Sequence, residues 1–370
     1  MKITVNKDDL LPALERARRL VERRNTIPTL ANIKLEAIGD RLTVTATDLD
    51  MQATATLPAE VAEPGEMTAP AHTLGEFVKK LEAGSVTIAE ADGKAAIRSG
   101  RSRASLNTLP PGDFPDLALG EFSHGFDLPA DALATMIARV SFAISTEETR
   151  YYLNGIYLHH AQDAQGAPLR AVATDGHRLA LHQVEMPAGG IGMPGIILPR
   201  KAVTEIEKLV GGLKDAPVHI DVSATKLRLA TGDTVFATKL IDGTFPDYSR
   251  VIPAANDKLV SLDKAALAAA VDRVSTIASE RGRAVKCSLN QGRLTLTVTN
   301  PDSGDATEDL VADYAGSVLD IGFNSRYVLD ILSAFPAARV HVALADPGSP
   351  ALFTIDGAAA PVFVLMPMRV

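Results

Sequence analysis

The sequence contains no tryptophan and a single cysteine, Cys287, among its 370 residues. One cysteine excludes a disulfide framework within the chain and any metal site built on several cysteines. Because Cys287 falls in a strand-like run, it is typical of a small buried apolar residue. The chain also lacks an apolar run of about 18 residues, the length that a membrane-spanning helix requires. Met1–Asp9 is polar and strand-like, unlike the apolar core of a secretion signal, so we expect a cytoplasmic protein.

A surplus of basic residues is missing too, since the formal net charge is −8. A generic nucleic-acid-binding protein usually has the opposite balance. The charges are unevenly distributed, however: arginines gather at 16–24 and 98–103, and acidic residues gather at 302–313. A basic edge and an acidic edge are complementary. They predict either head-to-tail association that closes a ring or edges that only prevent aggregation.

Familiar cofactor motifs are absent as well. The sequence has no Walker phosphate loop, no glycine-rich dinucleotide motif and no His-x-x-x-His pattern. His159 and His160 are adjacent in a strand-like run, so their side chains point to opposite faces and make a poor metal site. The sequence therefore indicates neither a metal nor another cofactor.

What the sequence does contain is a long internal repeat. Arg41–Asp48 (RLTVTATD), Arg170–Asp175 (RAVATD) and Arg293–Asn300 (RLTLTVTN) alternate apolar and polar residues and end in Asp or Asn. Their ends lie 127 and 125 positions apart, which is the length of a domain rather than of a solenoid unit. We expect three similar domains, at residues 1–120, 121–252 and 253–370, arranged as an arc or a ring.

Each third also begins with the pattern of an amphipathic helix. Apolar residues recur at helical spacing within 10–21, 133–144 and 267–278. Six positions after each opening leucine stands an arginine: Arg16, Arg139 and Arg273. Six helical steps place this residue away from the apolar stripe, so we expect three cations on solvent-facing helix surfaces. A second helical pattern follows in each third, at 72–81, 200–210 and 326–335.

Ala173–Ala180 (ATDGHRLA) brings a carboxylate, an imidazole and a guanidinium together. Asp175 and Gly176 stand between two alternating runs and predict a β-hairpin. Sequence spacing places no nucleophile or second base beside Asp175 and His177, so an enzyme built on these two residues remains only the minor alternative.

The carboxyl end, Val362–Val370 (VFVLMPMRV), is apolar almost to its last residue. Residues 362–365 fit a core strand. Pro367 should interrupt such a strand, and the methionines beside it are typical of a pliable binding surface.

These features together resemble the bacterial DNA polymerase III beta subunit family, the beta sliding clamps. The resemblance covers the whole chain and is most specific in Tyr151–Gly155 (YYLNG), Ala173–Ala180, Phe245–Tyr248 (FPDY) with Arg250 and Val251, and Met366–Arg369 (MPMR). It implies an α+β fold of three similar domains, each with sheets outside and two helices inside. Two such protomers pair head to tail into a ring, the DNA clamp fold.

The resemblance also implies the function. The ring would encircle double-stranded DNA, bind it through its phosphates without reading sequence, and tether the replicative polymerase, conferring processivity. The implied partners are the DNA polymerase III catalytic subunit, the clamp loader, other proteins that carry a clamp-binding motif, and a second copy of the chain. The implied role is non-catalytic and involves no membrane.

Three groups of residues follow from the resemblance together with the arginine pattern. Residues expected to face DNA are Arg16, Arg19, Arg23, Arg24, Arg139, Arg150, Tyr151, Tyr152, Arg200, Lys201 and Arg273. Residues expected to line the pocket for partner peptides are Leu153, Thr174, Gly176, His177, Arg178, Leu179, Pro246, Arg250, Val251, Val364, Leu365, Met366, Pro367, Met368 and Arg369. Residues expected at the dimer interface are Arg101, Arg103, Leu106, Ile277, Ala278, Asp302, Asp305 and Glu308.

Two positions depart from the family pattern. Glu147 places a carboxylate beside the expected DNA-facing loop, and Ala278 replaces a larger apolar residue at the expected interface. The alternatives to a clamp are a repeat scaffold that binds only proteins and the enzyme built on Asp175 and His177.

Overall fold

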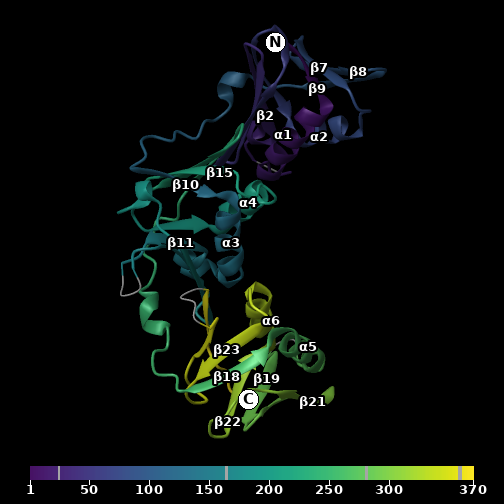
Figure 1. Cartoon of the computed structure of the whole chain (residues 1–370). Helices are drawn as coiled ribbons and strands as arrows, with labels where there is room; N and C mark the ends of the chain where they lie inside the picture. The colour runs from purple at the N-terminus through teal and green to yellow at the C-terminus, as the bar shows by residue number, and fades with distance from the viewer. Residues whose placement is uncertain (24–25, 163–165, 280–281, 357–360) are drawn as a thin grey trace. The chain divides into compact units, whose positions relative to one another are not determined.

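The computed structural model describes residues 1–23, 26–162, 166–279, 282–356 and 361–370. The chain forms two compact units (Figure 1). Unit 1 contains residues 1–130 and 208–240, and unit 2 contains residues 131–207 and 241–370. The middle third of the sequence therefore contributes to both units.

Unit 1 is built on two antiparallel sheets. The five-stranded sheet has the order β5 (Glu60–Glu63), β1 (Lys2–Asn6), β7 (Ser85–Ala91), β8 (Lys94–Ser99), β9 (Ser102–Asn107). The eight-stranded sheet has the order β10 (His124–Pro129), β15 (Pro217–Val222), β16 (Lys226–Thr231), β17 (Thr234–Lys239), β4 (Met51–Pro58), β3 (Arg41–Thr47), β2 (Asn32–Ile38), β6 (Gly65–Pro70). Helices α1 (Lys7–Leu20) and α2 (Ala71–Lys80) pack against each other, and α1 covers β3 and β4.

Unit 2 repeats this plan. Its eight-stranded sheet has the order β14 (Ile196–Pro199), β11 (Gly155–His160), β12 (Leu169–Thr174), β13 (Arg178–Val184), β25 (Val362–Leu365), β24 (Ala351–Thr354), β23 (Arg339–Leu344), β18 (Lys258–Asp263). Its four-stranded sheet has the order β21 (Gly304–Val311), β20 (Arg293–Asn300), β19 (Ala284–Asn290), β22 (Leu319–Asn324). The other helices are α3 (Ala130–Val140), α4 (Arg200–Val210), α5 (Lys264–Ser275) and α6 (Ser325–Ala334), and α5 packs against α6.

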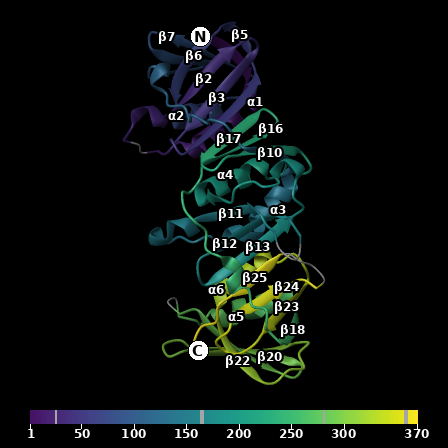
Figure 2. The same cartoon turned by 90° about the vertical axis from the view of Figure 1, so that its left-hand side faces the viewer.

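Both eight-stranded sheets join four strands from one third of the sequence to four strands from the next. The junction in unit 1 is the pairing of β17 with β4, where Phe236 lies opposite Ala53. The junction in unit 2 is the pairing of β13 with β25 (Figure 2). Ala180 lies opposite Phe363 in this pairing. The same construction occurs twice, which is what a chain of similar modules with open sheet edges produces.

Two of the three repeated strands, β3 and β12, end in the same turn. Thr47 and Thr174 each donate a hydroxyl hydrogen bond to the carbonyl oxygen four residues later, at 2.8 and 2.7 Å. The carboxylates of Asp48 and Asp175 then accept bonds from backbone N–H groups two and three residues onward. The repeat seen in the sequence therefore ends in a hydrogen-bonded turn that connects β3 to β4 and β12 to β13. The predicted hairpin at Asp175 is confirmed.

Side-chain caps start three of the helices. Asn6, Asp263 and Asn324 accept backbone N–H bonds from the first turns of α1, α5 and α6, at 2.9, 2.8 and 3.0 Å. Such caps satisfy donors that have no partner inside the helix. The predicted helices are confirmed, but two of them end earlier than their apolar patterns indicated.

The pattern from 267 to 278 is helical only to Ser275, so Ile277 and Ala278 lie beyond α5. Ser275 and Thr276 donate their hydroxyls to the carbonyl oxygen of Asp272 where the helix ends. Such bonds compete with the helical ladder. The pattern from 133 to 144 likewise passes from α3 into a short 3₁₀ turn, Ser141–Ala143.

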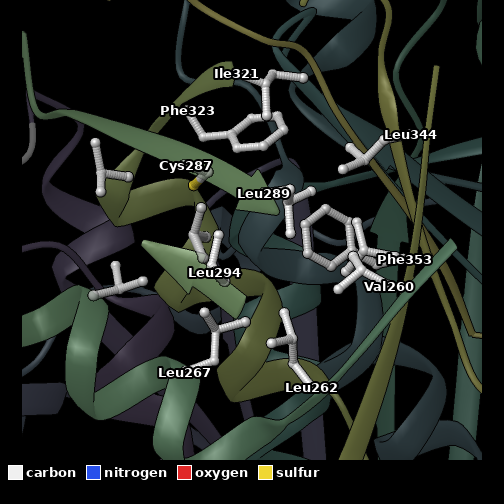
Figure 3. A pocket seen from close by; sticks show the side chains of 14 residues that line it. Val260, Leu262, Leu267, Cys287, Leu289, Leu294, Ile321, Phe323, Leu344 and Phe353 are labelled. Carbon is white, nitrogen blue, oxygen red and sulfur yellow. The ribbon is translucent and has the colours of Figure 1, made fainter. Parts of the chain in front are cut away.

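The core of the last third of the chain encloses a small apolar cavity of about 40 Å³ (Figure 3). Leu267 of α5, Cys287 and Leu289 of β19 and Phe353 of β24 contribute to its wall. Burial raises the pKa of the Cys287 thiol to about 12, so this thiol stays protonated at neutral pH. The thiol is thus unreactive, as predicted, although the residue as a whole is partly and not fully buried.

Candidate functional site

One face of the β11–β13–β25 region forms an apolar surface, which we call the site face. Strand alternation places Leu179 and Val364 side by side on it, and Val172 and Leu181 in the next row. These residues belong to a buried cluster with Leu153, Ile197 and Phe245. Three predicted pocket residues, Leu153, Leu179 and Val364, therefore meet although they are far apart in the sequence.

The segment Ile241–Ile252 packs against the site face, because its apolar side chains contact the same cluster. The Phe245 ring stacks on Tyr157 of β11, with centroids 4.9 Å apart and planes 5° from parallel. The segment ends in a 3₁₀ turn, Tyr248–Val251. The predicted pocket residues Pro246, Arg250 and Val251 are exposed on this segment, beside the buried cluster.

The carboxyl-terminal residues supply another wall. After β25, the Met366 N–H donates to the carbonyl oxygen of His177 at 2.9 Å, and the Met368 N–H donates to that of Gly322 at 2.9 Å. These two bonds carry the chain past Pro367 and leave the Met366 side chain 40% exposed. The sequence prediction of a core strand at 362–365 is confirmed. The tail beyond this strand is hydrogen-bonded to the β12–β13 hairpin, through His177, and to β22, through Gly322.

Arg178 has a different environment from the one expected of a cation at the pocket rim. Its backbone pairs with Leu365, so both side chains leave the sheet on the face opposite to Leu179 and Val364. Its guanidinium donates to Asp175, to Asp330 of α6 and to the carbonyl oxygen of Phe142, at 3.0, 2.6 and 2.7 Å. The guanidinium also lies 4.2 Å from the centroid of the Tyr327 ring. Arg178 thus ties β13 to α6, and Leu365 is fully buried.

His177 lies at the exposed tip of the hairpin and stacks against Tyr327, with centroids 6.2 Å apart. A hollow of about 400 Å³ opens here, lined by residues that include Glu147, His177 and Arg326. Sequence reasoning did not select Asn324, Tyr327 and Asp330, which contribute to this region. Only the helix-capping pattern at Asn324 offered a signal for them.

The arrangement around Asp175 does not support acid–base chemistry. Both carboxylate oxygens accept hydrogen bonds from within the turn, namely from the N–H groups of His177 and Arg178 and from the Arg178 guanidinium. A catalytic carboxylate would be hydrogen-bonded to the imidazole that it orients. The Asp175 carboxylate instead acts as the turn's internal cap.

Glu147 changes the surroundings of Arg150. The two side chains form a bidentate ion pair with N···O distances of 2.8 and 2.6 Å. The hydrogen bond from Arg150 lowers the pKa of Glu147. The guanidinium also lies close to Gly176, where an added Cβ would come within 2.6 Å of its Nη1 atom. Arg150 therefore stands beside the hairpin of the site with its charge partly neutralised.

The three arginines at equivalent helix positions are not equivalent in the structure. Arg16 is partly buried, and its burial, followed by the charge of Arg19, lowers its pKa. Arg139 donates to the carbonyl oxygen of Ala334 at the end of α6. Arg273 is 61% exposed and forms a bidentate ion pair with Glu308. Arg16 and Arg139 are thus partly buried and Arg273 is exposed, because helical spacing does not show what a long side chain reaches. The placement of these three cations toward DNA stays a prediction.

The other candidate DNA-facing residues vary in exposure. Arg19, Arg23, Tyr151, Arg200 and Lys201 are exposed, and Tyr152 is partly buried. Arg24 lies outside the described residues.

Six of the eight candidate interface residues lie on sheet edges or close to them, whereas Ile277 and Ala278 lie just beyond α5. β9 is the last strand of the five-stranded sheet and carries exposed Arg103 and partly exposed Leu106, with exposed Arg101 just before it. β21 is the last strand of the four-stranded sheet and carries exposed Asp305, with exposed Asp302 just before it. Each edge therefore offers unpaired backbone groups beside charges of one sign. Glu308 already pairs with Arg273.

The described residues contain no group of three or more His, Cys, Asp or Glu side chains placed to hold a metal ion. Among the same residues, no helix is long and apolar enough to cross a membrane.

Two eight-stranded sheets, each joining strands from successive thirds of the chain, and an apolar site face are typical of a binding protein assembled from repeated α+β modules. Models of the N-terminal, central and C-terminal domains of the DNA polymerase III beta subunit match residues 1–118, 127–247 and 249–369. The chain is 45% identical to the beta sliding clamp of Caulobacter vibrioides and 35% identical to that of Escherichia coli, over the full length of each. The chain therefore belongs to the DNA polymerase III beta subunit family, the beta sliding clamps.

Solved structures agree with this assignment. The sliding clamp of Bartonella birtlesii bound to griselimycin is 45% identical, with a TM-score of 0.97 over the whole of both chains. A sliding clamp of Caulobacter crescentus is 46% identical, with a TM-score of 0.96 and the same coverage. The clamp fold expected from the sequence is confirmed.

Proposed function

We propose that this protein is a sliding clamp that encircles duplex DNA as a homodimeric ring and tethers the replicative polymerase. The observation that carries the proposal is the repeated module: the same turn ends β3 and β12, and both eight-stranded sheets join strands from successive thirds of the chain. Membership of the sliding-clamp family supports it. The clamp contributes no chemical step of its own and works in the cytoplasm, where chromosomal DNA is copied in bacteria.

The proposed protomer has three domains, at residues 1–120, 121–252 and 253–370. The family models match three successive stretches of similar length, which supports this division. Each domain contributes one pair of helices: α1 with α2, α3 with α4, and α5 with α6.

Ring closure uses the two open sheet edges. Pairing β9 of one protomer with β21 of another would satisfy the unpaired backbone groups on both strands. Arg101 and Arg103 would then lie near Asp302 and Asp305. Exposed ion pairs of this kind contribute less than about 1 kcal/mol each, so they select the orientation more than they hold the ring together.

Contact with DNA rests on exposed cations of the helices. Arg19 and Arg23 lie at the end of α1 or just beyond it, and Arg200 and Lys201 begin α4. Contacts with phosphates carry no sequence information, and a ring need not bind tightly in order to stay on DNA. A protein with a net charge of −8 can therefore act on DNA if its cations face the hole.

Partner proteins bind at the site face. The buried cluster around Leu179 and Val364 is bordered by exposed Val251 and Met366, which suits the apolar side chains of a short linear peptide. Exposed Arg250 at this border suits an anionic group of the same peptide. The proposed occupants are motifs from the polymerase III catalytic subunit, the clamp loader and other clamp-binding proteins, and griselimycin, the ligand of the Bartonella clamp, is a proposed small-molecule ligand.

The test is primer extension on a long single-stranded circle by the polymerase III catalytic subunit and the clamp loader. Adding this protein is expected to lengthen the products of single binding events. Deleting Met366–Val370 should abolish this effect while light scattering still detects a dimer. Products of unchanged length with the intact protein would contradict the proposed function. A scaffold that binds only proteins would bind the polymerase without lengthening the products.

A further inference from the structure

The site face changes character in its third row. The first two rows are mainly apolar: Leu179 lies between Thr174 and Val364, and Val172 lies beside Leu181. In the third row, Arg170 of β12 lies between His159 of β11 and Gln183 of β13. Arg170 is nevertheless 93% removed from solvent, since only 7% of its surface is exposed. A guanidinium is buried in this way only when its donors are satisfied.

Part of that requirement is met by Gln183, whose side-chain oxygen accepts from Nε and Nη2 of Arg170 at 2.9 and 2.7 Å. The Nη1 atom donates to the hydroxyl of Tyr248, at 3.2 Å. The same hydroxyl lies 2.9 Å from Nε2 of His159. Because a guanidinium cannot accept a hydrogen bond, the Tyr248 oxygen accepts from Arg170 and its proton is free to go to His159.

Tyr248 begins the 3₁₀ turn that carries Arg250 and Val251. The segment containing this turn runs between β17 and β18 and belongs to neither sheet. Two aromatic residues attach it to the site face: Phe245, through its stack on Tyr157, and Tyr248, through its hydroxyl. A ring stack fixes distance but permits sliding, whereas a hydroxyl held between two fixed polar groups also fixes orientation.

We propose that His159 and Arg170 are positioning residues for the partner pocket, which act through the Tyr248 hydroxyl to hold the Pro246–Val251 wall in its binding conformation. Neither side chain needs to touch the bound peptide. The inference rests on the proposed partner site. It adds that the affinity of this site for a peptide depends on the polar network of His159, Arg170 and Tyr248, which lies in the row next to the apolar rows of the site face.

The test removes a single oxygen atom. Tyr248→Phe keeps the ring and its packing but deletes the hydroxyl. Tyr314→Phe is the matched control, because buried Tyr314 also donates its hydroxyl in a hydrogen bond, to the carbonyl oxygen of Ser317 at 2.5 Å, in the loop between β21 and β22. Griselimycin and the polymerase III catalytic subunit serve as two independent probes, with dissociation rates measured by surface plasmon resonance.

Tyr248→Phe is expected to weaken both probes about 5- to 10-fold, mainly through faster dissociation, as loss of one well-placed hydrogen bond implies. Tyr314→Phe is expected to lower the melting temperature about as much as Tyr248→Phe does, because each variant loses one hydroxyl hydrogen bond. It should leave the dissociation rates of both probes unchanged. His159→Ala should reproduce the loss, and His159→Gln, which retains a side-chain acceptor, should restore part of the affinity.

Wild-type dissociation rates in Tyr248→Phe would overturn the inference, as would equal weakening in Tyr314→Phe. These results differ from failure of the proposed function, in which the unaltered protein would bind neither probe. Dimerisation should be the same in every variant, since β9 and β21 are not altered.

Discussion

Gly322 offers a one-carbon test of how the carboxyl-terminal tail is held. Gly322 is buried in β22, and its carbonyl oxygen accepts the Met368 N–H at 2.9 Å. A Cβ atom at this position would lie 2.3 Å from a Val370 methyl carbon and 2.5 Å from the Met368 carbonyl oxygen. Both separations are far below van der Waals contact, so the tail of Gly322→Ala cannot remain where it is.

The expected cost follows from this geometry. Forcing one extra carbon into a packed site costs about 1–3 kcal/mol, and the exposed tail can escape that cost by detaching from β22. Partner binding requires the tail in place, so the cost reappears as lost affinity of about 5- to 150-fold. The melting temperature should change little, because the residues that detach are already partly or fully exposed.

The assay is isothermal titration with griselimycin and with the polymerase III catalytic subunit. Gly348→Ala is the matched control in the same third of the chain, since its Cβ would meet nothing closer than 3.4 Å. Deleting Met366–Val370 sets the lower limit of affinity. Wild-type affinity in Gly322→Ala would refute the reasoning that the docked tail forms a wall of the pocket.

Three further predictions concern stability. The hydrogen bond that His219 donates to the Asp127 carboxylate raises the pKa of His219. The pair therefore stabilises the fold below the ordinary histidine pKa, and this contribution disappears as pH rises through the elevated value. Because the pair is exposed, His219→Gln should lower the unfolding free energy by only about 0.5 kcal/mol, at pH 6 and not at pH 9, in melts compared at the two pH values. Leu49 has a φ of 77°, and the equivalent position of the Asp175 turn is a glycine, Gly176. A leucine is strained at this φ, so Leu49→Gly should raise the unfolding free energy by up to about 1 kcal/mol in urea titration. A decrease would contradict strain at this position. Cys287→Val should add about 0.8 kcal/mol by filling part of the 40 Å³ cavity, and a lower melting temperature would show that the cavity has no room.

The sequence predicted what depends on neighbours along the chain. The hairpin at Asp175 follows from turn chemistry within a few residues. The helix predicted at 326–335 begins at Ser325, where the Asn324 side chain caps it. The threefold spacing of the repeated strands revealed the modular fold, because each strand ends in its own local turn.

Contacts between distant parts of the chain could not be predicted in the same way. The bond from Arg139 to Ala334 and the ion pair of Arg178 with Asp330 join residues far apart in sequence. Periodicity placed Arg139 away from the apolar stripe, yet a long side chain can still reach a neighbouring helix terminus. The polar row of His159 and Arg170 could not be predicted either, because both side chains are hydrogen-bonded to the hydroxyl of Tyr248, which is distant in the sequence.

The most direct test of the account is retention on DNA of different topology. The clamp loader places the labelled protein on a nicked circle, and gel filtration separates bound from free protein before and after a restriction enzyme linearises the DNA. A ring that surrounds the duplex is expected to stay with the circle and to leave the linear form within minutes. Equal retention on both forms, or none on the circle, would contradict a closed ring of repeated modules.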